Sequence, residues 1–128
     1  MQLDVGARGE VECAVSDSDT AEAMGSGSLA VLGTPRLVAW CEAATCRAVE
    51  GRVPVGSSTV GTSVSLQHLA ASTVGARVTV TAVLLEVDGR RLVFEVEARD
   101  GSGAMVGKGH VERVVVDVQR FLARAVRG

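Results

Sequence analysis

The segment between Leu32 and Gly51 most constrains the fold, because it is the only long stretch of this chain that is typical of a helix. Thr34 is suited to cap its start, Pro35 is tolerated at the first helical position, and Gly51 can adopt the left-handed turn that ends a helix. Small or apolar residues recur at the three- and four-residue spacing of one buried face, namely Leu37, Cys41, Ala44 and Ala48. The sequence therefore predicts a long helix against which a sheet can pack closely.

Glu42 is the residue that does not suit a helix of this kind. It follows Cys41 on the buried face and is flanked by Trp40, Ala43 and Ala44, so we expect it at the boundary of the core or inside a pocket. An ionised carboxylate in that position is costly unless it is hydrogen-bonded. Glu42 is therefore a candidate for chemistry.

Length and charge limit the possible functions. The 128 residues are the size of one domain, spanning 1–128. Thirteen basic and fifteen acidic residues give a net charge of −2, with the arginines scattered, so nucleic acid is not expected as a partner. No apolar run approaches the roughly 20 residues that span a bilayer. The first residues do not resemble a secretory signal, so we expect no membrane association and a cytoplasmic location.

The cysteines argue against cross-links and metal. There are three of them, Cys13, Cys41 and Cys46, and none is in a C-x-x-C spacing. An odd number with this spacing favours neither a disulfide framework nor a zinc site. We expect buried, reduced thiols and no metal ion.

The rest of the chain alternates as strands. We expect an edge strand within 3–15 with an irregularity near 6–9, a short helix and loop within 16–28, four strands at 59–69, 77–88, 91–98 and 104–116, and an amphipathic helix at 117–126. Phe121, Leu122 and Val126 are the expected anchors of that last helix. In the strand at 59–69, strict alternation places His68 on the more apolar face and Gly61 on the other.

This order predicts an α+β fold in which one long central helix is wrapped by a curved antiparallel sheet of about five strands. That architecture is the hotdog fold. Four segments carry a resemblance to a family with this fold: T-A-E-A-M-G-S-G (20–27), V-L-G-T-P-R-L-V-A-W-C-E (31–42), G-T-S-V-S-L-Q-H-L-A-A-S (61–72) and G-H-V-E-R-V-V-V (109–116). With them in this order and spacing, the chain resembles the hotdog-fold acyl-CoA thioesterase superfamily, most closely its fluoroacetyl-CoA thioesterase-like branch.

The resemblance implies hydrolysis of an acyl-CoA thioester, in which CoA is part of the substrate and no separate cofactor is needed. It implies Thr34, Glu42 and His68 as catalytic residues, with Gly61 on the oxyanion side and Arg113 as a further substrate-binding residue. Glu42 can act as base or nucleophile, His68 as proton shuttle and the Gly61 N–H as oxyanion donor. Thr34 can orient the substrate or accept the acyl group.

One departure from the family pattern and two alternative functions accompany this interpretation. The segment from Gly25 to Ala30 lacks the aromatic lid of the fluoroacetyl-CoA branch, which predicts a broader acyl range. A hotdog-fold enoyl-thioester hydratase or dehydratase is an alternative, although the paired Asp and His of those relatives is not recognisable here. A non-catalytic acyl-thioester-binding protein is another.

Spacing adds an expectation about assembly. Eight helical residues separate Thr34 from Glu42 by about 12 Å, so the two cannot touch if Thr34 caps the helix. They contact different ends of the substrate group or different protomers, unless the helix starts later than Pro35. Gly61 and His68 lie about 23 Å apart along a regular strand. Antiparallel pairing of two such strands about an axis near Val64 and Ser65 would bring them together, so we expect a homodimer, with a dimer of dimers as a larger possibility.

Overall fold

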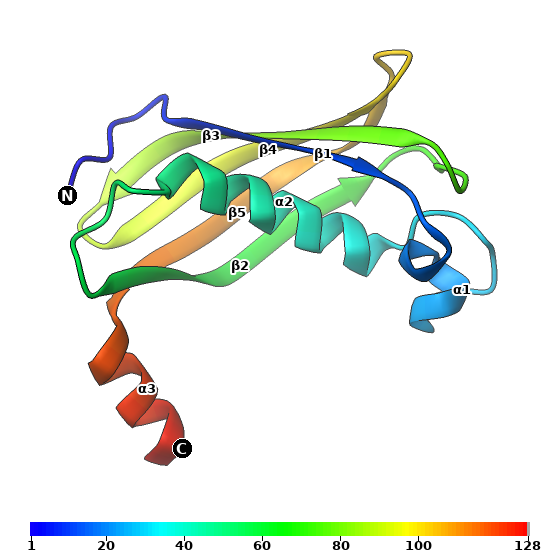
Figure 1. Cartoon of the computed structure of the whole chain (residues 1–128). Coiled ribbons are helices and arrows are strands. Elements are labelled where there is room, and N and C mark those ends of the chain that lie inside the picture. The colour runs from blue at the N-terminus through cyan, green and yellow to red at the C-terminus, as the bar shows by residue number, and fades with distance from the viewer. Residues whose placement is uncertain (128) are drawn as a thin grey trace.

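The computed structural model describes residues 1–127, which form one antiparallel sheet and a long helix with three short helical segments. The elements are β1 (Arg8–Ala14), a 3-10 turn η1 (Asp17–Asp19), α1 (Ala21–Met24), α2 (Thr34–Val49), β2 (Ser57–His68), β3 (Arg77–Asp88), β4 (Arg91–Asp100), β5 (Met105–Asp117) and α3 (Val118–Arg127). The strand order is β1-β3-β4-β5-β2, so β1 and β2 are the two edges. Figure 1 shows α2 lying across the curved sheet. The predicted α+β architecture is confirmed.

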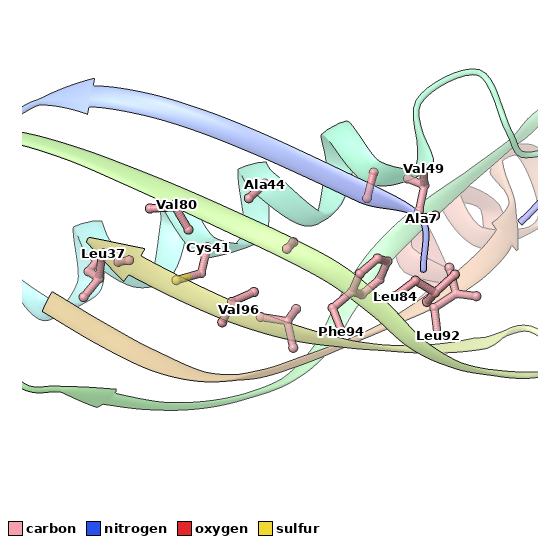
Figure 2. Close-up of a cluster of buried hydrophobic side chains, with 14 of the residues drawn as sticks. Ala7, Leu37, Cys41, Ala44, Val49, Val80, Leu84, Leu92, Phe94 and Val96 are labelled. Carbon is pink, nitrogen blue, oxygen red and sulfur yellow. The ribbon is translucent and has the colours of Figure 1, made fainter. Parts of the chain in front are cut away.

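The core lies between α2 and the sheet. The predicted face of α2 is 0–1 % exposed at Leu37, Cys41, Ala44 and Ala48. Figure 2 shows this face directed at apolar side chains of β3 and β4, among them Val80, Leu84, Leu92, Phe94 and Val96. The small residues of α2 let β1 come close, because a Cβ added to Gly9 would lie 2.2 Å from the Ala44 carbonyl oxygen. This close packing fixes the position of α2 on the sheet, and with it the positions of the side chains that leave the helix away from the buried face.

The ends of α2 agree with the sequence in part. Pro35 lies in the first turn, and Gly51 has the left-handed φ of +72° that ends the helix. The prediction that Thr34 caps the helix is wrong: Gly33 is the N-cap and Thr34 is the first helical residue. Because a helical Thr34 has no capping role, its hydroxyl is available for a contact outside the helix.

β2 contains an irregularity that the sequence did not reveal. Its pairing with β5 shifts between Gly61 and Ser63, which leaves Thr62 as an extra residue. One extra residue reverses the alternation of side chains on either side of it. Gly61 therefore faces α2, as His68 does, and the prediction that these two residues lie on opposite faces is wrong.

Two expectations outside the core are also corrected. α3 is amphipathic as predicted, but its expected anchors do not pack on the chain, because Phe121 is 40 %, Leu122 55 % and Val126 88 % exposed. Of the three free cysteines, Cys41 is buried as expected, whereas Cys13 is half-buried and Cys46 is exposed, since it lies on the side of α2 away from the sheet. Within residues 1–127, no helix is both long enough and apolar enough to cross a bilayer.

Candidate active site

Thr34 and His68 form one group of polar side chains. Thr34 opens α2 and His68 ends β2, and their Oγ1 and Nδ1 atoms are 2.8 Å apart. The His68 Nε2 atom is buried and has no hydrogen-bond partner in the described part of the chain. Burial lowers the pKa of His68 because it disfavours the charged imidazolium, and the backbone of Ala70 acts in the opposite direction. The lowered pKa of His68 favours the neutral imidazole, which is the form that can accept a proton.

A shallow pocket adjoins this pair. Its volume is about 280 Å³, and it is lined by the pair itself and by small or apolar residues of the segments beside it, namely Ala21, Ser26, Val31, Leu32, Ala70 and Ala71. The Thr34 hydroxyl is exposed at this pocket. The hydroxyl and the imidazole therefore both belong to the wall that a group in the pocket would meet.

Glu42, Arg113 and Thr59 form the second group, two helical turns away. Arg113 is only 6 % exposed, and each of its three guanidinium nitrogens donates one hydrogen bond. Its Nε donates to the Thr59 hydroxyl at 2.9 Å, its Nη2 to the Thr59 carbonyl at 3.0 Å, and its Nη1 to Glu42 Oε2 at 3.3 Å. Because Thr59 fixes the guanidinium plane, Arg113 fixes the position of the Glu42 carboxylate.

Glu42 lies at the boundary of the core, as predicted. Its side chain is 37 % exposed while that of Arg113 is 7 % exposed, so the carboxylate has one face toward the protein and one toward solvent. This placement avoids the cost of a fully buried charge and keeps one oxygen free for a ligand. The predicted need for a hydrogen-bonding partner is met by Arg113.

Gly61 lies directly against this carboxylate. A Cβ added at Gly61 would be 2.2 Å from Glu42 Oε2 and 3.4 Å from Arg113 Nη1. Only glycine leaves room for the carboxylate above the strand, so the residue identity follows from the contact. The bulge after Gly61 interrupts the ladder with β5 at this point.

The five residues selected from the sequence thus fall into two clusters. Thr34 contacts His68, and Glu42 lies with Gly61 and Arg113, but the clusters occupy opposite ends of β2 along the same face. Because α2 begins at Thr34, the possibility that it starts later is excluded. Within residues 1–127, no three His, Cys, Asp or Glu side chains are grouped so that they could hold a metal ion.

Thr59 is the residue that sequence reasoning missed. A threonine in a strand is an ordinary β-former, so its type gives no signal of a role. The available signal is its position two residues before Gly61, which places both on one face of the strand. The contact with Arg113 depends on the pairing of β2 with β5, which the sequence alone does not give.

A helix wrapped by a curved five-stranded antiparallel sheet, as in this chain (Figure 1), is the hotdog fold. A solved protein from Thermus thermophilus, a member of the thioesterase superfamily, matches with a TM-score of 0.91 at 26 % identity, over 98 % of this chain and 92 % of that one. These similarities place the chain among hotdog-fold proteins of the thioesterase superfamily.

The match to one family is more specific. The family model described as fluoroacetyl-CoA-specific thioesterase covers residues 15–119. The fluoroacetyl-CoA thioesterase of Streptantibioticus cattleyicolor is 38 % identical over 94 residues, which are 73 % of this chain and 67 % of that protein. A Thr-to-Ser mutant of a fluoroacetyl-CoA thioesterase, solved in complex with acetyl-CoA, matches with a TM-score of 0.91 at 31 % identity over 98 % of both chains. The chain belongs to the fluoroacetyl-CoA-specific thioesterase family.

Proposed function

We propose that this protein hydrolyses acyl-CoA thioesters to a free acid and CoA, in a site that two copies of the chain build together. The observation that carries the proposal is the 2.8 Å contact between the Thr34 hydroxyl and His68 Nδ1, which is the separation of a nucleophile and its base. Membership of a thioesterase family supports the reaction class. CoA enters and leaves as part of the substrate and product, so the reaction needs no separate cofactor.

In the proposed first step, Thr34 Oγ1 attacks the thioester carbonyl while neutral His68 accepts the hydroxyl proton. The new C–O bond forms, the C–S bond breaks, and the imidazolium returns the proton to the departing CoA thiolate. In the second step Glu42 accepts a proton from water as the water oxygen attacks the acyl-threonine ester. The bond between the acyl carbon and Thr34 Oγ1 then breaks, the proton passes from Glu42 to the departing Thr34 oxygen, and the acid is released. The Gly61 N–H donates to the oxyanion that develops in both steps. Arg113 acts as a positioning residue for Glu42.

Two chains are needed because one chain separates these groups. β2 is an edge strand, and an unpaired edge is a template for a second strand. Residues directly opposite in an antiparallel pair point to the same face. With the bulge at Thr62, a two-fold axis at Ser65 sets Gly61 of one copy opposite His68 of the other, on the face that carries α2. Each of the two sites then takes Thr34 and His68 from one copy and Glu42 and Gly61 from the other.

Mixing two inactive variants tests the shared site. Gly61→Val places a side chain in the space that the Glu42 carboxylate occupies, and His68→Ala removes the proposed base. Random exchange makes half of the dimers mixed, and each mixed dimer has one intact site of two, so activity should return to about a quarter of wild type, rising toward a half if exchange favours mixed dimers. Failure of the mixture to recover, with exchange shown by mass spectrometry, would contradict the shared site. Full activity in a strictly monomeric sample would contradict it as well.

Substrate assays separate the alternatives. Release of CoA from acetyl-, propionyl- and butyryl-CoA, followed with a thiol reagent, tests hydrolysis and the proposed breadth of the acyl range. Crotonyl-CoA distinguishes a hydratase, because hydration removes the enoyl absorbance without releasing a thiol. A protein that binds these thioesters and changes none of them would be a binding module. The three free cysteines support a reducing compartment, so we place the reaction in the cytoplasm.

A further inference from the structure

α3 has two sharply different faces. At 100° per residue, the apolar side chains occupy one continuous arc, formed by Val118, Phe121, Leu122, Ala125 and Val126. The opposite arc carries Arg120, Arg124 and Arg127, and the helix contains no acidic residue. No side chain of α3 is buried. The chain therefore builds a cationic amphipathic helix and leaves its apolar face without a partner.

The position of α3 indicates where a partner lies. Val118 follows β5 directly, and its N–H donates to the Gly56 carbonyl just before β2 begins. Figure 1 shows α3 projecting away from the sheet past β2, the edge opposite β1. A second chain that pairs with β2 would occupy the space beside this edge. α3 thus begins next to the edge on which the proposed dimer forms.

The register of that dimer identifies the contact more closely. Asp117, the last residue of β5, pairs with Ser57 at the start of β2. In a pair centred on Ser65, the start of one β2 lies beside the residues that follow His68 in the other copy. Leu69 is 52 % exposed in that segment. Leu29, 66 % exposed, is in the adjoining loop, which the bridge between Val31 and Thr73 ties to the same segment.

Charge favours the same contact. From residue 15 to residue 35 the chain has three acidic residues and no Lys or Arg. Asp19 is paired with Arg36, whereas exposed Asp17 and Glu22 form no ion pair with any of residues 1–127. The exposed leucines of this surface complement the apolar face of α3, and its carboxylates attract the net positive charge of the helix as it approaches.

We propose that α3 is an arm that packs, through Phe121 and Leu122, on the second copy of this chain at the end of its β2, beside that copy's Thr34 and His68. The inference rests on the dimer of the proposed function. It assigns the exposed apolar face to a second copy rather than to lipid. By covering Leu69 and Leu29, the arm shields the outer end of the shared site from water.

Cysteine cross-linking tests the contact between chains. In a background with Cys13→Ser and Cys46→Ser, one preparation carries Leu122→Cys and the other Leu69→Cys. After mixing and mild oxidation, a covalent dimer should form between the two preparations. The control replaces Leu69→Cys by Leu85→Cys, an exposed position on β3 that is 41 % exposed and far in the sheet order from β2, and should give no such dimer. Absence of the 122–69 cross-link, while the variants of the mixing experiment still restore activity, would overturn the arm and leave the shared site standing.

Kinetic and vesicle-binding measurements test the same contact without oxidation and distinguish a second copy of the chain from lipid. Phe121→Ser with Leu122→Ser should raise the KM for acetyl-CoA several-fold with the dimer still present in sedimentation, whereas the matched substitution Ala123→Ser, on the side away from the apolar arc, should not. An unchanged KM in the double variant would overturn the proposal. Binding of the wild-type protein to phosphatidylglycerol vesicles, lost in the double variant and unaccompanied by the cross-link, would assign the face to lipid and overturn it too.

Discussion

Gly61→Ala is the substitution whose effect can be worked out most directly from the structure. The added Cβ would lie 2.2 Å from Glu42 Oε2, whereas ordinary contact begins at 3.4 Å. The carboxylate must therefore move by about 1 Å, which also lengthens its 3.3 Å contact with Arg113. A displacement of that size at a catalytic group costs about 100-fold in rate. We expect a loss of this order in kcat/KM for acetyl-CoA.

Stability should change little in the same variant. The Glu42 side chain is long and 37 % exposed, so it can swing toward solvent without disturbing the core. The change in the free energy of unfolding, measured by urea denaturation, should stay within about 1 kcal/mol. Gly101→Ala is the matched control, because nothing lies within 4 Å of its Cβ position and its φ is not left-handed.

A double-mutant cycle shows whether Gly61→Ala acts through Glu42. If it does, Gly61→Ala combined with Glu42→Gln should be no slower than Glu42→Gln alone, since the displaced group has already been disabled. Additive losses in the double variant, or a Gly61→Ala enzyme close to wild type, would refute the reasoning.

Three further predictions concern the same clusters. Glu42→Gln should keep the fold and lose most hydrolysis, because the amide has the shape of the carboxylate but not its basicity. The control variant Glu50→Gln, at the exposed C-cap of α2, should stay active. Near wild-type turnover of Glu42→Gln would exclude a catalytic Glu42. Since burial lowers the pKa of His68, the acid limb of the pH profile of kcat/KM should lie below pH 6.5, and an acid limb above pH 6.5 would contradict a desolvated base. The free energy of unfolding should fall as the pH drops below 6.5, because the histidine of the unfolded chain takes up a proton before that of the folded chain. Thr59→Val should cost about 1–3 kcal/mol of unfolding free energy and lower activity, because Arg113 loses the hydroxyl that holds its Nε. The control variant Thr62→Val removes a hydroxyl that makes an exposed 3.3 Å contact and should cost less than about 0.5 kcal/mol. Equal effects of the two variants would show that Thr59 is not a positioning residue.

The parts of the fold that follow local rules could be predicted from the sequence. Pro35 and Gly51 mark the ends of α2, the spacing of Leu37 and Cys41 gives its buried face, and alternation gives Leu92, Phe94 and Val96 as inward residues of β4. These signals are local because helix ends and pleat alternation depend on neighbouring residues alone. The core and its layering were predictable for that reason.

What could not be predicted depends on pairing between distant segments. The extra residue in β2 is Thr62, which is an ordinary strand residue, and only the register against β5 shows that it is unpaired. That one residue decides whether Gly61 faces α2 or solvent. Thr59 is a similar case, since its role depends on Arg113 lying across the ladder. The exposed face of α3 could not be predicted either, because amphipathicity indicates that a helix packs and does not say on which chain.

The Thr59–Arg113–Glu42 chain accounts for the position of the Glu42 carboxylate at the boundary of the core rather than inside it. A nearly buried guanidinium needs hydrogen-bond partners, and removing one partner of such a pair is far more costly than the pair itself is stabilising. Thr59 supplies two of the bonds from a rigid strand, so the charge of Arg113 is held in place whether or not Glu42 is engaged with substrate. Glu42 supplies only one bond, at 3.3 Å, and keeps an exposed side. This division of contacts lets the carboxylate be oriented by the protein and still exchange a proton with water, which the proposed second step of hydrolysis requires.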